Sequence, residues 1–195
     1  MIKQNEQLTL PEGKYTTNTL RFENSDRKIL FKIYRDWLKL SDQLSDIEAR
    51  RVNIPEGLTE SAFCLEMDAV RITDKLKGVK GLSNKKEKSS FDAYSHITKK
   101  RIQIKAASVP SAPSSFGPSS EWDILYYLDF YRKGLWDGKF DIYEISSKDI
   151  YSAKVNANKT LAEQQLEGKR PRFSIYTKII QAKGLTPIKI GNLNP

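Results

Sequence analysis

Apolar residues recur at alternating intervals of three and four positions across residues 27–51, which predicts an amphipathic α-helix. Pro55-Glu56-Gly57 interrupts this pattern, and Thr59 is a candidate N-cap for a second helix over residues 60–72. Apolar residues cover most sides of the second helix, so we expect it to be packed inside the protein. The periodic positions of the first helix are Leu30, Ile33, Trp37, Leu40, Leu44 and Ile47.

Apolar and alternating runs later in the chain predict β-strands. Residues 92–94 and 101–107 form the two arms of a predicted hairpin, with the turn in residues 95–100. Two more strands are expected at residues 122–130 and 139–145. Helices followed by strands and then by helices are typical of an α/β fold at the border of α+β, with a mixed central β-sheet flanked by helices.

The other segments are polar or short. We expect a polar arm over about residues 1–23, a polar loop over residues 75–90, and irregular structure where Pro, Ser and Gly dominate residues 110–120. At 195 residues, the whole chain is expected to be one domain with this arm attached. Short helices are predicted over residues 147–153, 160–167 and 174–183, the last capped by Ser174 and ended by Gly184.

The amino-acid composition indicates which class of binding partner and which cellular compartment to expect. The chain has 33 Lys and Arg against 24 Asp and Glu, and its net charge of +9 favours polyanions, nucleic acid before anionic membranes. No apolar run is long enough to span a bilayer, and no signal-type apolar core follows the N-terminus. The single cysteine, Cys64, rules out an internal disulfide and favours the cytoplasm. One histidine and one cysteine are too few for a zinc site.

Polar side chains interrupt the apolar pattern of the strand at residues 101–107. Because side chains alternate along a strand, its isoleucines face the core while Gln103 and Lys105 share the other face. The hairpin brings Asp92 to the same end, and Glu60 begins a helix that must pack on this sheet. Two carboxylates, an amide oxygen and an ammonium group suit Mg²⁺-dependent phosphodiester hydrolysis, in which Lys105 orients or deprotonates the attacking water.

At this point the sequence resembles a known family. Asp92, ten residues and then Gln103-Ile104-Lys105 resemble the signature of PD-(D/E)XK nucleases, and Glu60 resembles the extra glutamate of many type II restriction endonucleases. Phe91 replaces the signature proline, and Gln103 stands where the family usually has an acid, so either Glu60 supplies the missing charge, or the site is weaker or inactive. The likeness runs from about residue 55 onward and includes residues 117–123, 140–145 and 170–176.

The resemblance implies a restriction-endonuclease-like fold with Mg²⁺, which Mn²⁺ could replace, held by Asp92, Gln103 and Glu60, and with Lys105 as a further catalytic residue. It also implies sequence-specific cleavage of double-stranded DNA by a homodimer whose symmetry matches a palindromic site. A repair or junction nuclease and a non-catalytic basic nucleic-acid-binding protein stay open as alternatives. The candidate DNA contacts are Ser114, Ser115, Ser119, Ser120, Glu121, Arg170, Arg172, Lys85 and Lys86.

Each of the four site residues also has an ordinary structural interpretation. Asp92 can begin a hairpin, and Glu60 is favourable in the first turn of a helix. Gln103 and Lys105 can line the solvent-exposed face of a half-buried sheet. The joint order of the four along the chain, rather than any one of them, favours the metal site.

Overall fold

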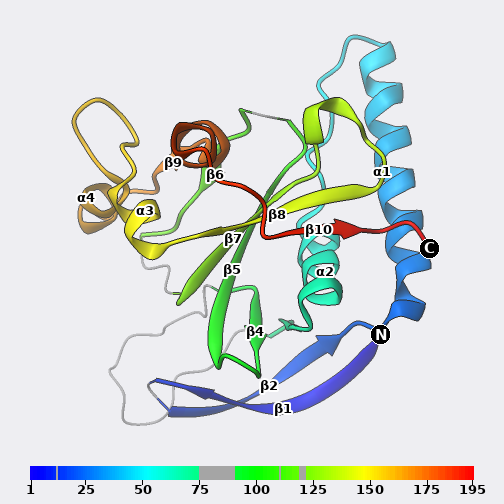
Figure 1. The fold of residues 1–195 in the computed structure, drawn as a ribbon, viewed down its shortest axis with the longest axis horizontal. Helices are drawn as coiled ribbons and strands as arrows, with labels where there is room; N and C mark the ends of the chain where they lie inside the picture. The colour runs from blue at the N-terminus through cyan, green and yellow to red at the C-terminus, as the bar shows by residue number, and fades with distance from the viewer. Residues whose placement is uncertain (12, 75–90, 110, 119–121) are drawn as a thin grey trace.

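The computed structural model describes residues 1–11, 13–74, 91–109, 111–118 and 122–195. These residues form an eight-stranded sheet in the order β1-β2-β3-β4-β5-β7-β8-β10 (Figure 1). Strands β5 and β7 are parallel and the other neighbours are antiparallel, so the sheet is mixed. The bounds are β1 (Ile2–Leu10), β2 (Gly13–Arg21), β3 (Val70–Ile72), β4 (Ala93–Ser95), β5 (Lys100–Ala107), β7 (Ile124–Asp129), β8 (Lys139–Ile145) and β10 (Lys189–Asn192).

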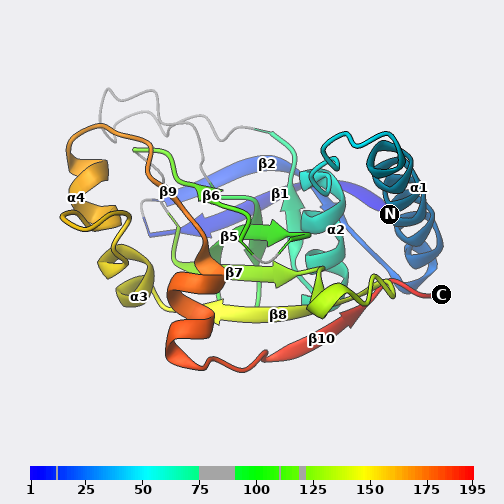
Figure 2. The ribbon, with the colours of Figure 1, turned by 90° about the horizontal axis from the view of Figure 1, so that it is seen from above.

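Helices cover both faces of this sheet. On one face, α1 (Arg27–Asp46) and α2 (Glu56–Met67) bury a cluster that includes Phe63, Ile102 and Ile104. On the other face lie α3, α4 and a π-helix, seen at the opposite end of the molecule from α1 in Figure 2. These helical elements are α3 (Ser147–Ser152), α4 (Leu161–Leu166) and η3 (Tyr176–Gln181), and the short 3₁₀ turns are η1 (Asn24–Asp26) and η2 (Arg132–Gly134).

The architecture confirms the predicted fold class, a mixed central sheet flanked by helices. The predicted hairpin forms as β4 and β5, and β8 has the predicted bounds. The Ser174 hydroxyl accepts a hydrogen bond from the backbone nitrogen of Thr177 at 3.2 Å, as the predicted cap requires. Among the residues described, no helix combines the length and the apolar character needed to cross a membrane.

In the segment expected to be a polar arm, β1 and β2 form a β-hairpin that extends the main sheet. Most side chains of β1 are polar and exposed, so the strand shows little of the apolar alternation that would reveal it. Leu8 and Leu10 at its end are buried in the core. Antiparallel pairing between Leu20 of β2 and Arg71 of β3 then joins the hairpin to the sheet.

The bounds of the second predicted helix also need correction. It begins at Glu56 and ends at Met67, and the following residues return as strand β3. Thr59 is not its cap: Pro55 precedes the first turn, and the Thr59 hydroxyl donates to the carbonyl of Glu56 at 3.0 Å. The helix ends before Asp68, whose backbone is in the left-handed region with φ 48°. Glu60 therefore lies in the second turn of α2 rather than at its start.

Three further strands that the sequence did not reveal, β6, β9 and β10 (Lys189–Asn192), complete the fold. The segment 110–120, expected to be irregular, contains β6 (Ser114–Ser115), which pairs with β9 (Arg172–Phe173) in a separate small sheet. Strand β10 pairs with β8, where Gly191 lies over the ring of Phe140 so closely that a Cβ atom would fall 2.3 Å from it. Only glycine fits at this position, and this glycine interrupts the apolar pattern that would otherwise predict a strand.

The C-terminal end of α2 is tied to distant parts of the chain through Glu66. Its carboxylate accepts from Arg27 of α1 at 2.7 Å and lies 3.2 Å from the ammonium group of Lys189 in β10. The backbone nitrogen of Asn192 donates to the same carboxylate at 3.4 Å. The position of α2 over the sheet therefore depends on contacts from both α1 and β10.

Candidate active site

The hairpin places Asp92 directly across from Gln103. Ala93 pairs with Ile102 in the antiparallel register, and the backbone nitrogen of Asp92 donates to the carbonyl of Ile102 at 2.8 Å. Opposite residues in such a pair have side chains on the same face of the sheet. The Asp92 carboxylate accepts hydrogen bonds from the side-chain amide of Gln103 and, at 2.7 Å, from the backbone nitrogen of Ile104. Asp92 is therefore fixed by its neighbours on β5.

A second carboxylate reaches the same place from α2. Burial, and after it the negative charge of the Glu60 carboxylate, raises the pKa of Asp92 to about 7. Burial also raises the pKa of Glu60, against the opposing effect of Arg71, whose Nε donates to Glu60 at 2.6 Å. Two partly buried acids held together in this way form a site at which positive charge is favoured.

Lys105 supplies part of that positive charge. It lies two residues after Gln103 on the same face of β5, and its charge lowers the pKa of both Asp92 and Glu60. Its ammonium group lies 5.9 Å from the centre of the Phe116 ring. The structure thus brings together the four residues that the sequence singled out, Glu60, Asp92, Gln103 and Lys105.

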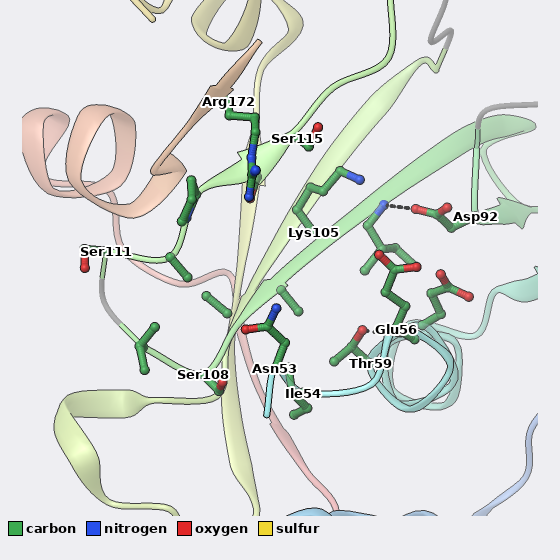
Figure 3. Close-up of a pocket in the computed structure, with 18 of the residues that line it drawn as sticks. Asn53, Ile54, Glu56, Thr59, Asp92, Lys105, Ser108, Ser111, Ser115 and Arg172 are labelled. Atoms are coloured by element: carbon green, nitrogen blue, oxygen red, sulfur yellow. Dashed lines mark hydrogen bonds between the residues drawn. The ribbon is translucent and has the colours of Figure 1, made fainter. Parts of the chain in front are cut away.

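A cavity of about 490 Å³ opens beside these residues. One side, which we call the acidic wall, carries Glu56, Glu60 and Asp92. The other side, which we call the basic wall, carries hydroxyl and guanidinium groups from β6, β9 and the segment before β9. Figure 3 shows Lys105 between Asp92 on one side and Ser115 and Arg172 on the other. The basic wall consists of Ser114, Ser115, Arg170 and Arg172.

The basic wall contains four of the predicted DNA contacts. Ser114 pairs with Phe173 and Ser115 with Arg172, which joins the two segments, and both segments line the same cavity as Lys105. The structure does not test whether these residues bind DNA. The other predicted contacts, Lys85, Lys86, Ser119, Ser120 and Glu121, lie outside the residues that the structure describes.

The donor set of the acidic wall fits a hard divalent cation, with one qualification for Gln103. Carboxylate oxygens are the ligands that Mg²⁺ prefers, and Mg²⁺ keeps several waters, so two acids are sufficient. In the described part of the chain no three His, Cys, Asp or Glu residues lie close enough to hold a metal together. Gln103 is buried and turns its amide nitrogen toward Asp92, so a half-turn of the amide is needed before its oxygen could face a cation.

Sequence reasoning missed several residues of the cavity. Glu56 lies one helical turn before Glu60, and its charge also raises the pKa of Asp92 and Glu60. That i, i+4 spacing was the available signal, but the helix was expected to begin too late for it to be used. Arg50 and Asn53, which also line the cavity, come from the connection between α1 and α2 and carry no local signal.

Comparison with known proteins decides the family. A family model described as Bsp6I restriction endonuclease matches residues 22–182. The chain belongs to the Bsp6I restriction endonuclease family. Type II restriction enzyme Bsp6I from Bacillus sp. (strain RFL6) is 32% identical over 171 residues, which cover 86% of each chain. No solved structure matches the sequence.

Membership of the Bsp6I family confirms the prediction of a type II restriction endonuclease, an enzyme class. It removes support from the non-catalytic alternative and from the repair or junction nuclease. The matched segment contains all four candidate catalytic residues and the whole basic wall, since it runs from residue 22 to residue 182. All of β1, β2 and β10 lie outside it.

Proposed function

We propose that this protein is a Mg²⁺-dependent, sequence-specific endonuclease that cuts double-stranded DNA, acting as a homodimer of single nuclease domains. The observation that carries the proposal is the meeting of Asp92, Glu60 and Lys105 at one cavity whose opposite wall is basic. Family membership supports the same reaction, because the Bsp6I relative is named as a type II restriction enzyme. The proposed core signature is that of the PD-(D/E)XK nucleases, with Gln103 in place of the second acid.

In this proposal Asp92 and Glu60 hold the metal ion. When bound, a divalent cation polarises the scissile phosphate and lowers the pKa of a coordinated water. Asp92 is held in place for this role by the backbone nitrogen of Ile104, and Glu60 by the guanidinium of Arg71. A cation would also remove the repulsion between the two buried carboxylates, which otherwise raises the pKa of Asp92. Mn²⁺ should substitute because it accepts the same oxygen ligands.

Lys105 acts on the attacking water and on the phosphate. Its ammonium group orients the water and offsets the negative charge that develops in the transition state. In hydrolysis the water oxygen forms a new bond to phosphorus while one phosphodiester P–O bond breaks. Gln103 has two proposed roles, holding Asp92 through its amide nitrogen or, after a half-turn, ligating the metal through its amide oxygen.

The basic wall is proposed to hold the DNA across the cavity from the carboxylates. Arg170 and Arg172 can contact phosphates or the edge of guanine, and the Ser114 and Ser115 hydroxyls can contact the backbone. Lys85, Lys86, Ser119, Ser120 and Glu121 stay proposals for further contacts, and the net charge of +9 favours association with the polyanion.

Digestion of plasmid DNA with the purified protein tests the function. With Mg²⁺ or Mn²⁺ we expect discrete fragments, and sequencing of their ends should show one short palindromic motif. With EDTA, or with Ca²⁺ in place of Mg²⁺, cleavage should stop. Cleavage with ends spread over unrelated sequences would contradict sequence specificity, and undiminished cleavage in EDTA would contradict the metal requirement.

A further inference from the structure

Two neighbouring arginines between α1 and α2 make different contacts. We call this segment, residues 47–55, the connection. The Arg51 guanidinium donates to the Ser45 hydroxyl at 3.1 Å and to the Asp42 carboxylate at 2.5 Å, both on α1. The Arg50 side chain is exposed and makes no hydrogen bond or ion pair with any residue that the structure describes. It lines the cavity instead.

The connection is held against the rest of the fold at several points. The Arg51 guanidinium lies 5.2 Å from the centre of the Trp136 ring. The indole nitrogen of Trp37 donates to the carbonyl of Val52 at 3.0 Å. Ile54 is buried in the core cluster beneath α1 and α2. These contacts fix the backbone of the connection before any ligand binds, which lowers the entropy cost of binding.

Asn53 also faces the cavity. Its side chain is exposed, and Figure 3 shows it on the opposite side of the cavity from Arg172 and Ser115. Among the described residues, none forms a hydrogen bond with its amide. The connection therefore presents a guanidinium and an amide to the cavity, both with their hydrogen-bonding capacity unused by the fold.

This pair of side chains suits the edges of bases better than it suits phosphates. A phosphate presents acceptors only, so it would leave the acceptor oxygen of the Asn53 amide unused. A base edge presents donors and acceptors side by side. Guanine takes a bidentate arginine through O6 and N7, and the N6 and N7 atoms of adenine match an amide in the same way.

We propose that Arg50 and Asn53 read base edges of the DNA in the cavity, and that the connection is a determinant of sequence specificity. Arg50 contacts a guanine, and Asn53 contacts a second base pair. This inference rests on the proposed function, because it takes double-stranded DNA as the ligand of the cavity. The basic wall and the connection then contact the DNA from opposite sides, and Arg51 is a positioning residue that holds the connection in place.

Cleavage of duplexes that each differ from the wild-type site by one base pair tests Arg50. We expect Arg50→Ala to lower the discrimination against changes of one G·C pair by roughly 10- to 100-fold, with the preference at other positions unchanged. Arg35→Ala, an exposed arginine on α1, is the matched control and should discriminate as wild type does. Unchanged discrimination in Arg50→Ala overturns the proposed role of Arg50.

Gel shifts on the same duplexes, with Ca²⁺ in place of Mg²⁺, separate a base contact from a phosphate contact. Loss of a phosphate contact weakens binding about equally for every sequence and reduces the salt slope by about one. Loss of a base contact weakens binding mainly to the wild-type site. An Arg50→Ala variant that loses affinity equally for all duplexes therefore also overturns the base contact.

Two substitutions of Asn53 provide an independent test. Asn53→Ala should relax the preference at a different base pair from the one affected by Arg50→Ala. Asn53→Asp should change the preferred base, because a carboxylate can accept from the amino group of cytosine but cannot donate. The position is exposed, so both variants should fold normally. Wild-type preference at every base pair in Asn53→Ala would exclude Asn53 from the readout.

Arg51→Ala tests whether the held connection matters for reading. Arg51 does not line the cavity, so it acts only through the residues that it positions. We expect Arg51→Ala to lower discrimination at the same base pairs as the Arg50 and Asn53 variants. A lower Tm with unchanged discrimination would show that Arg51 stabilises the fold alone, and would refute its positioning role.

Failure of this inference and failure of the proposed function give different results. If wild type cuts one site and the Arg50 and Asn53 variants keep its base preference, the inference is refuted and the nuclease stands. If wild type never cuts DNA but binds one sequence preferentially, and Arg50→Ala relaxes that preference, the nuclease is refuted and the base contact stands.

Discussion

The two walls of the cavity form in different ways. The acidic wall rests on a local hairpin and one helix, in which Asp92 and Gln103 meet because β4 and β5 are neighbours in sequence. In the basic wall, Ser115 pairs with Arg172 in a two-stranded sheet that no local sequence pattern predicts. The wall proposed for chemistry is therefore formed largely by segments close in sequence. The wall proposed for DNA contact is formed by segments that are far apart in sequence. Substitutions on each wall should have separable effects.

Lys105→Ala is expected to slow cleavage strongly and isolates the chemical step. We expect the cleavage rate to fall by about 10³-fold, since charge stabilisation and proton handling are each worth about two orders of magnitude or more. DNA affinity measured by gel shift with Ca²⁺ should change little. Lys100→Ala, an exposed lysine at the start of the same strand, is the control and should cut normally. Equal cleavage by both variants would remove Lys105 from the mechanism.

Arg172→Ala should affect binding and leave chemistry almost intact. Loss of one arginine contact to DNA costs about 1–3 kcal/mol, which is roughly a 10- to 100-fold loss of affinity. Single-turnover cleavage at saturating enzyme should stay close to wild type. Arg35→Ala, an exposed arginine on α1, is the matched control and should bind DNA as wild type does. A drop in the single-turnover rate without a loss of affinity would contradict the division of roles between the walls.

Gln103→Glu tests the ligand that departs from the family pattern. If the residue ligates the metal, the added carboxylate should lower the half-saturating Mn²⁺ concentration by about tenfold while cleavage is retained. Calorimetric titration of Mn²⁺ into the protein without DNA measures this directly. Weaker Mn²⁺ binding would instead show that Gln103 serves by donating its amide hydrogen to Asp92.

Asp92→Asn should abolish cleavage but stabilise the metal-free protein at alkaline pH. The pKa of Asp92 is about 7 in the folded protein against an ordinary 3.8, so the folded state binds this proton more tightly than the unfolded chain does. In EDTA, stability should therefore rise as pH falls through 7 and be lowest above it. Asparagine cannot ionise, so it removes the free-energy cost of ionising Asp92 in the folded protein. This cost is on the order of 1–3 kcal/mol at pH 8, which corresponds to a few degrees in Tm. A Tm difference that does not change between pH 5 and pH 8 would contradict it.

Elements formed by neighbouring segments could be predicted from the sequence better than elements formed by distant segments. The alternation of Gln103 and Lys105 with isoleucines was sufficient to find the β4–β5 hairpin and its polar face. The β1–β2 hairpin was not predicted because most of β1 is polar. Strand β10 was not predicted because it is short and crosses Phe140 with a glycine. Glu56 was missed because Thr59 resembled a helix cap, while Pro55 actually precedes the first turn. Pairings between distant segments, such as β6 with β9, depend on tertiary packing.

The anchoring of α2 through Glu66 has a consequence for the order of events during synthesis. Glu66 receives Lys189 and Asn192 from β10, which follows every other strand in the chain. While a ribosome is still adding the preceding residues, the helix that bears Glu60 lacks these partners. The contacts of β10 with the helix that carries Glu60, the proposed metal ligand, would thus form only after β10 has emerged.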